Sequence, residues 1–260
     1  PGKVAVKVHS GEVGNQNFIR PSFMKPMVDH VKGTIVECNA AYEGKRNTTD
    51  AHWETMKLPG WTDIAPVDIM DEEGEMELPV PEGKRIQVNY VGAHLANYDS
   101  MLVLSHFKGH PMGGFGGALK NISIGIASSH GKAYIHGSGK PEEIWTGDHD
   151  SFLESMADAD KSIVKHFGDK IAFINVMRNM SVDCDCVAKA ADPCMKDIGI
   201  LASLDPVALD QACIDMVYQS DDPGKAELIE RIESRNGTLT IKAAEAVGVG
   251  TREYELVNVD

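Results

Sequence analysis

The residues with the clearest chemical potential lie between Ser105 and Asn121, in the segment SHFKGHPMGGFGGALKN. His106, Lys108 and His110 occur at every second position, so an extended chain would place their side chains on one face. Histidine exchanges protons and binds transition metals near neutral pH, and lysine supplies a positive charge. This spacing predicts a catalytic group made of these three residues.

Glycines fill the second half of this segment and allow a ligand or another backbone to come close. Lys120 lies three residues after the last glycine and precedes Asn121, so the P-loop pattern is absent, as is the Gly-x-Gly-x-x-Gly spacing of dinucleotide sites. The alternative, a tight turn between packed strands, would not need histidines and lysines on both sides. The predicted cofactor-binding residues are Gly113, Gly114, Gly116, Gly117, Lys120 and Asn121.

Further histidines follow the glycine segment at His130 and His136, which gives four histidines between positions 106 and 136. A single histidine is more often structural, but this clustering predicts a functional role for at least one. His110 and His136 are the stronger candidates, and His106 and His130 are the weaker ones.

Three cysteines form a second candidate group. Cys184 and Cys186 would share one face of an extended segment, and Cys194 could add a third soft metal ligand. A Cys-x-Cys pair with one distant cysteine is a weaker signal than two Cys-x-x-Cys pairs, and two small side chains near a strand end are the alternative. Cys38 and Cys213 fall in strand and helix patterns and are predicted to be core residues.

Arg46 lies in the polar loop YEGKRNTTD, directly after a predicted strand. Ligands of parallel α/β proteins gather outside the carboxyl ends of the strands, and a guanidinium group can bind a carboxylate or phosphate with two parallel hydrogen bonds. Arg46 is therefore the candidate substrate-binding residue. The alternative is a solvated surface arginine.

The pattern of apolar residues predicts an α/β protein. Strand, helix and strand signals follow one another at Lys3–Val8, Pro21–Lys32 and Thr34–Cys38, which is a βαβ unit and implies parallel pairing. Further strands are predicted at 64–70, 85–91, 101–104, 171–177 and 254–259, and further helices at 51–58, 151–167, 206–217 and 223–232, with a last one ending near Ala246. We expect one domain over residues 1–260 with a mostly parallel sheet and helices on both faces; a division into lobes 1–95 and 96–260 is the alternative.

One acidic stretch imitates a calcium loop. Asp158, Asp160 and Ser162 stand at the first, third and fifth positions, but the glycine needed at the sixth position is Ile163. The apolar spacing of a helix continues through this stretch, so we predict a helix and no calcium site.

Composition narrows the classes of partner. The formal net charge is −14, with 39 acidic and 25 basic residues, which disfavours nucleic acid and anionic membranes. No apolar run approaches the roughly 18 residues of a membrane span, and the first residues lack the pattern of a signal peptide. Five cysteines do not suggest a disulfide framework. We expect a cytoplasmic protein.

Several motifs carry a family resemblance: GKVAVKVHSGEVGN, SHFKGHPMGGFGGALKN, SVDCDC and DIGILASLDPVALDQA. Over nearly its whole length the chain resembles the family filed as domain of unknown function 362, often labelled uncharacterised iron–sulfur centre proteins. Members that earn this label carry a ferredoxin-like insertion after the segment equivalent to His136–Pro141. The corresponding residues here, Glu142–Asp150, contain no cysteine, so no ferredoxin-type iron–sulfur cluster is expected.

The spacing of His110, Lys120 and His136 is also similar, more distantly, to that in the nickel-pincer lactate racemases. This resemblance implies that Lys120 anchors a cofactor, that His136 binds its metal and that His110 moves a proton. It also implies that Arg46 holds the acidic group of the substrate. The early half of the chain shows no histidine pair to supply the second acid/base group of such a racemase, which counts against that reaction.

These features predict a metal- or cofactor-dependent enzyme that moves a proton or hydride on a small anionic substrate. Zinc, nickel, iron or a flavin would suit the candidate residues. One alternative is a flavin- or redox-linked oxidoreductase with a redox partner protein. Another is a non-enzymatic metal-binding or carrier protein, in which Cys184, Cys186 and Cys194 matter more than the histidines.

Overall fold

The computed structural model of the chain describes residues 2–259. Among these residues, six strands form a central sheet in the order β10-β9-β6-β1-β2-β3. Only β9 and β10 pair antiparallel, so the mostly parallel α/β sheet predicted from the sequence is confirmed. The strands are β1 (Val4–Lys7), β2 (Thr34–Glu37), β3 (Val67–Ile69), β6 (Ser100–His106), β9 (Ile171–Met177) and β10 (Gly199–Ser203).

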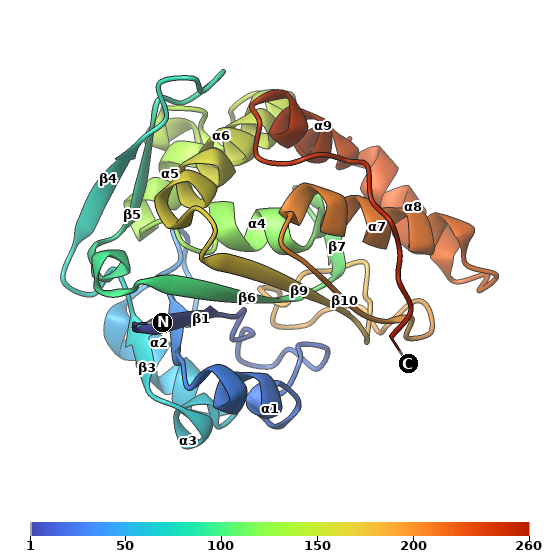
Figure 1. Cartoon of the computed structure of the whole chain (residues 1–260), viewed down its shortest axis with the longest axis horizontal. Helices are drawn as coiled ribbons and strands as arrows, with labels where there is room; N and C mark the ends of the chain where they lie inside the picture. The colour runs from blue at the N-terminus through green and yellow to red at the C-terminus, as the bar shows by residue number, and fades with distance from the viewer. Residues whose placement is uncertain (1, 260) are drawn as a thin grey trace.

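Helices cover both faces of the sheet (Figure 1). One face carries α1 (Pro21–Val31), α2 (Thr49–Lys57) and α3 (Trp61–Ile64), and the other carries α4 (Ala118–Ser123), α6 (His149–Phe167) and α7 (Pro206–Gln219). Alternation along the strands supplies both cores: in β1, Ala5 packs into the cluster beneath α4 and α7, and Val6 packs with residues of α1. Because both faces of the sheet are covered, consecutive residues of β1 and β2 are apolar and buried until each strand ends at a buried charged residue, Lys7 or Glu37.

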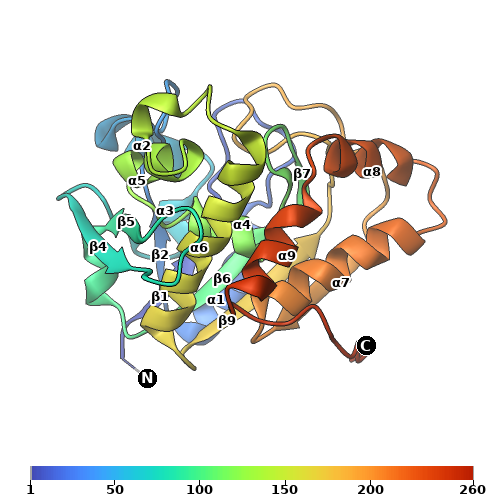
Figure 2. The ribbon, with the colours of Figure 1, turned by 90° about the horizontal axis from the view of Figure 1, so that it is seen from above.

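The remaining elements extend this frame. The hairpin of β4 (Glu75–Pro79) and β5 (Val88–Gly92) leads through the 3-10 helix η1 (Ala93–Asn97) into β6. Two short strands, β7 (Lys108–His110) and β8 (Gly114–Gly116), form a separate pair, followed later by α5 (Ser129–His136) and η2 (Pro141–Glu143). The helices α8 (Lys225–Ser234) and α9 (Thr238–Ala246) follow α7, and α9 lies beside α6 above the sheet (Figure 2).

Some predicted elements are wrong in detail. Residues 254–259 form no strand; this tail is mostly exposed and runs past α7, where Tyr254 donates a hydrogen bond to Asp215 (Figure 1). Ile64 ends α3 instead of beginning a strand, and β3 begins at Val67. The apolar strand does not continue straight through His110, because β6 ends at His106 and β7 turns away to pair with β8.

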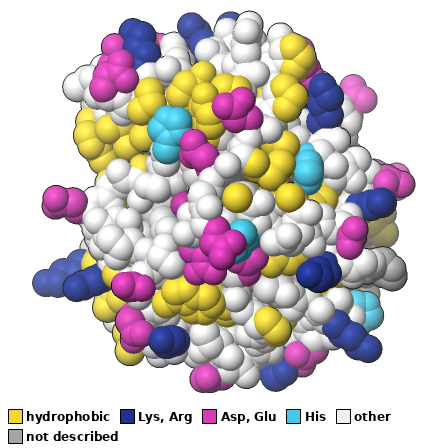
Figure 3. All heavy atoms as spheres, turned by 90° about the vertical axis from the view of Figure 1, so that its left-hand side faces the viewer, with side chains coloured by type: hydrophobic (Ala, Val, Ile, Leu, Met, Phe, Trp, Pro, Cys, Tyr) yellow, Lys and Arg dark blue, Asp and Glu magenta, His cyan; other side chains and the backbone are white. Residues whose placement is uncertain are grey.

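None of the described helices is long and apolar enough to cross a membrane. On the face shown in Figure 3, acidic and basic side chains are interspersed with apolar ones.

The acidic stretch of α6 is helical, as predicted, and its aspartates serve the fold. Asp158 accepts hydrogen bonds from the backbone N–H groups of residues 84–86 at 2.6–3.0 Å. Asp160 is fully buried, and neither of its carboxyl oxygens accepts a hydrogen bond of normal geometry from a described residue. Burial, together with the nearby charge of Asp210, raises the pKa of Asp160 well above its usual value.

We predict that Asp160→Asn flattens the pH dependence of stability. A carboxyl group with a raised folded pKa stabilises the fold fully below its unfolded pKa, and this stability is lost as the pH rises towards the folded pKa. Wild type should therefore lose up to about 1.4 kcal/mol per pH unit relative to Asp160→Asn above pH ~4. Urea unfolding at several pH values measures this difference, with the exposed Asp169→Asn as the control; equal slopes in wild type and Asp160→Asn would contradict the assignment.

Candidate functional site

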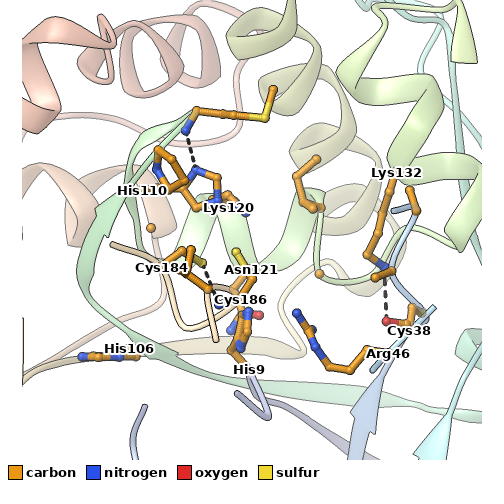
Figure 4. A pocket seen from close by; sticks show the side chains of 18 of the residues that line it. His9, Cys38, Arg46, His106, His110, Lys120, Asn121, Lys132, Cys184 and Cys186 are labelled. Carbon is orange, nitrogen blue, oxygen red and sulfur yellow. Dashed lines mark hydrogen bonds between the residues drawn. The ribbon is translucent and has the colours of Figure 1, made fainter. Parts of the chain in front are cut away.

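A cavity of about 350 Å³ lies at the carboxyl ends of β1, β2 and β6 (Figure 4). This is the edge of a parallel sheet where α/β proteins bind ligands, and the volume is within the roughly 300–1,000 Å³ typical of small-molecule sites. Three groups of polar side chains line it. The cations are Lys7, Arg46, Lys108, Lys120 and Lys132, the histidines are His9, His106, His110 and His136, and the thiols are Cys38, Cys184 and Cys186.

Most residues predicted from the sequence line this one cavity, although their roles stay predictions. They are His106, Lys108, His110, Gly116, Gly117, Lys120, Asn121, Arg46, His136, Cys184 and Cys186. Gly113, Gly114, His130 and Cys194 are not part of its wall. His130 lies on the surface beside Glu75, and the thiol of Cys194 donates to the carbonyl of Met180 at 3.3 Å.

Asp185 fixes two of the predicted catalytic residues. Its carboxylate is 2.9 Å from Nδ1 of His106 and 3.2 Å from Nζ of Lys108. Burial alone would raise the pKa of Asp185, but the charges of His106 and Lys108 lower it far below its usual value. Because Nε2 of His106 also lies 2.6 Å from the carbonyl oxygen of Arg178, both ring nitrogens face acceptors and neither is left for a ligand.

A second ion pair anchors the floor of the cavity. Nζ of Lys7 lies 2.6 Å from Glu37 and 3.0 Å from Oδ1 of Asn121, and the amide group of Asn121 donates to Ser105 at 3.0 Å. Burial would raise the pKa of Glu37, but Lys7 and then His9 lower it below its ordinary range. Asn121 therefore orients Lys7, and both ends of its side chain are bonded to protein atoms.

His110 is held by the loop that follows it. Its Nδ1 accepts hydrogen bonds from the backbone N–H groups of Met112 at 3.1 Å and Gly113 at 2.9 Å, which leaves the proton of the neutral ring on Nε2. The ring is also hydrogen-bonded to Cys184, and burial, with the charge of Lys120, lowers the pKa of His110 to about 4. His110 is therefore a neutral N–H donor at pH 7.

Three glycines of the predicted loop, Gly113, Gly114 and Gly117, are also needed for contacts within the chain. The N–H group of Gly113 is used by His110, and a Cβ on Gly114 would come within 2.8 Å of the Cα of Gly237. A side chain on Gly117 would collide with the carboxylate of Asp210, which accepts hydrogen bonds from the N–H groups at the start of α4. The close approach that these three glycines permit is thus to other parts of the chain.

His136 has the opposite arrangement from His110. Its Nδ1 lies 2.7 Å from the carbonyl oxygen of Lys132, so Nδ1 carries the proton and Nε2 keeps a lone pair. The ring stacks on Phe152 with centroids 4.6 Å apart, and burial lowers the pKa of His136 to about 4. A neutral imidazole oriented by a backbone carbonyl can act as a base or a metal ligand.

Two cations of the cavity wall are only partly neutralised. Arg46 is 5% exposed, and its Nε lies 3.3 Å from Glu12, while its guanidinium group points into the cavity (Figure 4). This excludes the alternative of a solvated surface arginine. The ammonium group of Lys120 makes no hydrogen bond or ion pair with another residue of the described chain, 2–259. Burial, together with the charges of Lys108 and Arg46, lowers the pKa of Lys120.

The two cysteines of the Cys-x-Cys segment both face the cavity, but on a turn instead of the extended segment that was predicted. The N–H group of Val187 closes this turn on the carbonyl of Cys184 at 3.0 Å. His110, Cys184 and Cys186 each present a ligand atom within 4.8 Å of the others. A hydrogen bond from Cys184, together with the charges of Lys120 and Arg46, lowers the pKa of Cys186 to about 6.

Comparison with known proteins places the chain in a family. The model of the domain of unknown function DUF362 matches residues 4–215. The chain belongs to the DUF362 family. No curated protein matches the sequence.

Two solved structures are similar to this DUF362 chain at low identity. The lactate racemase apoprotein from Thermoanaerobacterium thermosaccharolyticum has 15% identity and a TM-score of 0.48, over 83% of this chain and 48% of that protein. A structural-genomics crystal structure of a Thermotoga maritima protein has 12% identity and a TM-score of 0.43, over 95% of this chain and 55% of that protein. The chain thus spans about half the length of each.

Sequence reasoning missed several cavity residues of this DUF362 member, above all His9. This half-buried side chain lies beside Cys184 and Arg46, its Nδ1 accepts a hydrogen bond from the N–H group of Gly11 at 3.1 Å, and desolvation lowers its pKa. Lys132 and Trp145 were also missed. The position of His9 could have predicted its place in the site, because His9 lies in the loop after β1, just as Arg46 lies in the loop after β2.

We predict that Asp185→Asn destabilises the fold by about 3–5 kcal/mol, because the buried ammonium group of Lys108 loses its counter-charge and Nδ1 of His106 loses its carboxylate partner. Chemical unfolding measures the change. The exposed Asp192→Asn is the control and should stay within about 0.5 kcal/mol of wild type. If Asp185→Asn lowers the free energy of unfolding by less than about 1 kcal/mol, the contacts of Asp185 with His106 and Lys108 do not stabilise the fold.

Proposed function

We propose that this chain is an enzyme that binds a small organic anion in the cavity and moves a proton on it. The observation that carries the proposal is the unbalanced positive charge of the cavity wall. Glu37 neutralises Lys7, and Asp185 neutralises Lys108, but Arg46 shares only a 3.3 Å contact with Glu12. Lys120 has no carboxylate partner among residues 2–259, and Lys132 donates to backbone carbonyls. The thiol of Cys186, whose pKa is lowered to about 6, adds one negative charge near Lys120 and Arg46, and cations still outnumber anions around the cavity. A surplus of cations in a cavity favours an anionic ligand.

The guanidinium group of Arg46 is the group best suited to hold a carboxylate, because it can donate two parallel hydrogen bonds. Lys120 would stabilise negative charge that develops on the ligand during the reaction. Such stabilisation is strong in a cavity shielded from water, since the effective dielectric constant there is low.

His136 is the proposed base, because its Nε2 lone pair is free while Nδ1 is held by the carbonyl of Lys132. His110, with its proton on Nε2, is the proposed donor. His136 could remove a proton at a carbon next to a carboxylate and then return the same proton, while the N–H group of His110 donates a hydrogen bond to the developing negative charge. Transfer of a hydride requires a bound acceptor, and Lys120, with its lowered pKa, is the residue placed to attach one.

We expect short-chain carboxylates to bind to the cavity and their primary amides not to bind. Arg46→Met should weaken the binding of carboxylates about 10- to 100-fold, because it removes charged hydrogen bonds worth roughly 1.5–3 kcal/mol. Isothermal titration calorimetry measures both effects. Arg178→Met, at an exposed ion pair, is the matched control and should bind like wild type. Equal binding by Arg46→Met and wild type would contradict the proposal.

We expect the exchange of an acidic C–H proton of a bound carboxylate with solvent deuterium to depend on His136. His136→Asn should slow this exchange about 10²- to 10⁴-fold, as is usual for loss of a general base, while binding is retained. Proton NMR in deuterated water follows the exchange directly. The exposed His30→Asn is the control. Unchanged exchange in His136→Asn would show that another group is the base.

A further inference from the structure

Three soft or borderline donors meet on one side of the cavity. His110 comes from β7, and Cys184 and Cys186 come from the turn that follows β9 by several residues. Their ligand atoms all lie within 4.8 Å of one another, close enough for one metal ion to reach all three. Thiolate and imidazole ligands together select zinc-class transition metals over calcium or magnesium.

We propose that His110, Cys184 and Cys186 bind one zinc-class divalent metal ion, with a fourth coordination position open towards the cavity. This set differs from the one predicted from the sequence, in which Cys194 was the third ligand. Cys194 is bonded to the carbonyl of Met180 and does not belong to the group. Two cysteines and one histidine with an open position are a combination that catalytic zinc sites use.

The surroundings of the two sulfur atoms suit metal ligands. The N–H group of Cys186 donates to Sγ of Cys184 at 3.4 Å, and the ring of His9 is hydrogen-bonded to the same sulfur. Asp185 lies between the two cysteines, and its buried ion pairs with His106 and Lys108 hold the turn against β6 and β7. Outer groups of this kind orient the ligands and tune the charge on sulfur.

His110 must change its hydrogen bonding to coordinate a metal. Its Nδ1 accepts the N–H groups of Met112 and Gly113, so Nε2 carries the ring proton. Coordination through Nε2 displaces that proton, and the ring then needs an acceptor for a proton on Nδ1. The backbone N–H groups of Met112 and Gly113 therefore have to turn away from Nδ1. Metal binding also releases protons, because cysteine thiols bind a metal as thiolates.

A metal bound to Nε2 of His110 would take the place of the Nε2–H group in the proposed reaction: the metal would act as the Lewis acid, and His136 would remain the base. Arg46 and Lys120 line the same cavity as the three ligands, so an oxygen of a small anion could reach the metal while its carboxylate contacts the cations. This Lewis-acid role rests on the proposed function, whereas the binding of the metal does not. Experiments can therefore contradict the metal site and the proposed function independently of each other.

The experiment is a titration of the reduced, chelator-treated full chain with cobalt(II) chloride without oxygen. Cobalt reports its ligands, because thiolates produce a sulfur-to-cobalt charge-transfer band in the near ultraviolet. We expect this band to saturate at one equivalent and to disappear on addition of zinc. Cys184→Ser and Cys186→Ser should each remove most of the band, and His9→Ala should weaken binding about 10- to 100-fold, as loss of an outer group does.

Cys194→Ser is the matched control, because it removes a half-buried cysteine outside the group and should leave the band unchanged. Circular dichroism of each variant separates loss of a ligand from loss of the fold. If wild type binds no cobalt with a charge-transfer band, or if both Cys184→Ser and Cys186→Ser fold and keep the full band, the proposal is overturned. Binding of carboxylates, measured by calorimetry, tests the proposed function independently of the cobalt charge-transfer band.

Discussion

The buried carboxylate of Asp185 joins the parts of the chain on which the cavity depends. It pairs with His106 at the end of β6 and with Lys108 in β7, while the backbone carbonyl of Asp185 accepts the N–H group of Glu12 at 2.8 Å. One residue thereby ties the cysteine turn to two strands and to the loop that follows β1. A buried charge of this kind is costly unless it is fully paired, so the geometry around it is tightly constrained.

The cavity concentrates positive charge inside a chain whose formal net charge is −14. Two of the cavity's five cations are balanced one to one: Lys7 by Glu37, and Lys108 by Asp185. Arg46 and Lys120 are not paired in this way. They lie beside two neutral histidines, so the residues that would bind an anion differ from those that would move a proton. Since neither His110 nor His136 is charged at pH 7, Nε2 of His136 can accept a proton and Nε2–H of His110 can donate a hydrogen bond.

The sequence was sufficient for the sheet and for the neighbourhood of the site, because apolar strands and the polar residues after them follow local rules. Arg46 and the segment from His106 to Lys120 could be assigned to one sheet edge on that basis. The hydrogen bonds of each histidine could not be predicted from the sequence, because their partners, such as Asp185 and Lys132, are not identified by any local pattern. The same holds for Gly114 and Gly117, whose close neighbours, Gly237 and Asp210, are distant in the sequence.

The central claim is that a small organic anion binds between Arg46 and Lys120. A crystal structure with a bromine-bearing short carboxylate tests it most directly, because anomalous scattering locates the bromine independently of the protein phases. The account predicts an anomalous peak inside the cavity, with the carboxylate against the guanidinium group of Arg46 and within reach of Nζ of Lys120. Peaks confined to the outer surface, with the cavity occupied by water alone at saturating ligand, would contradict it.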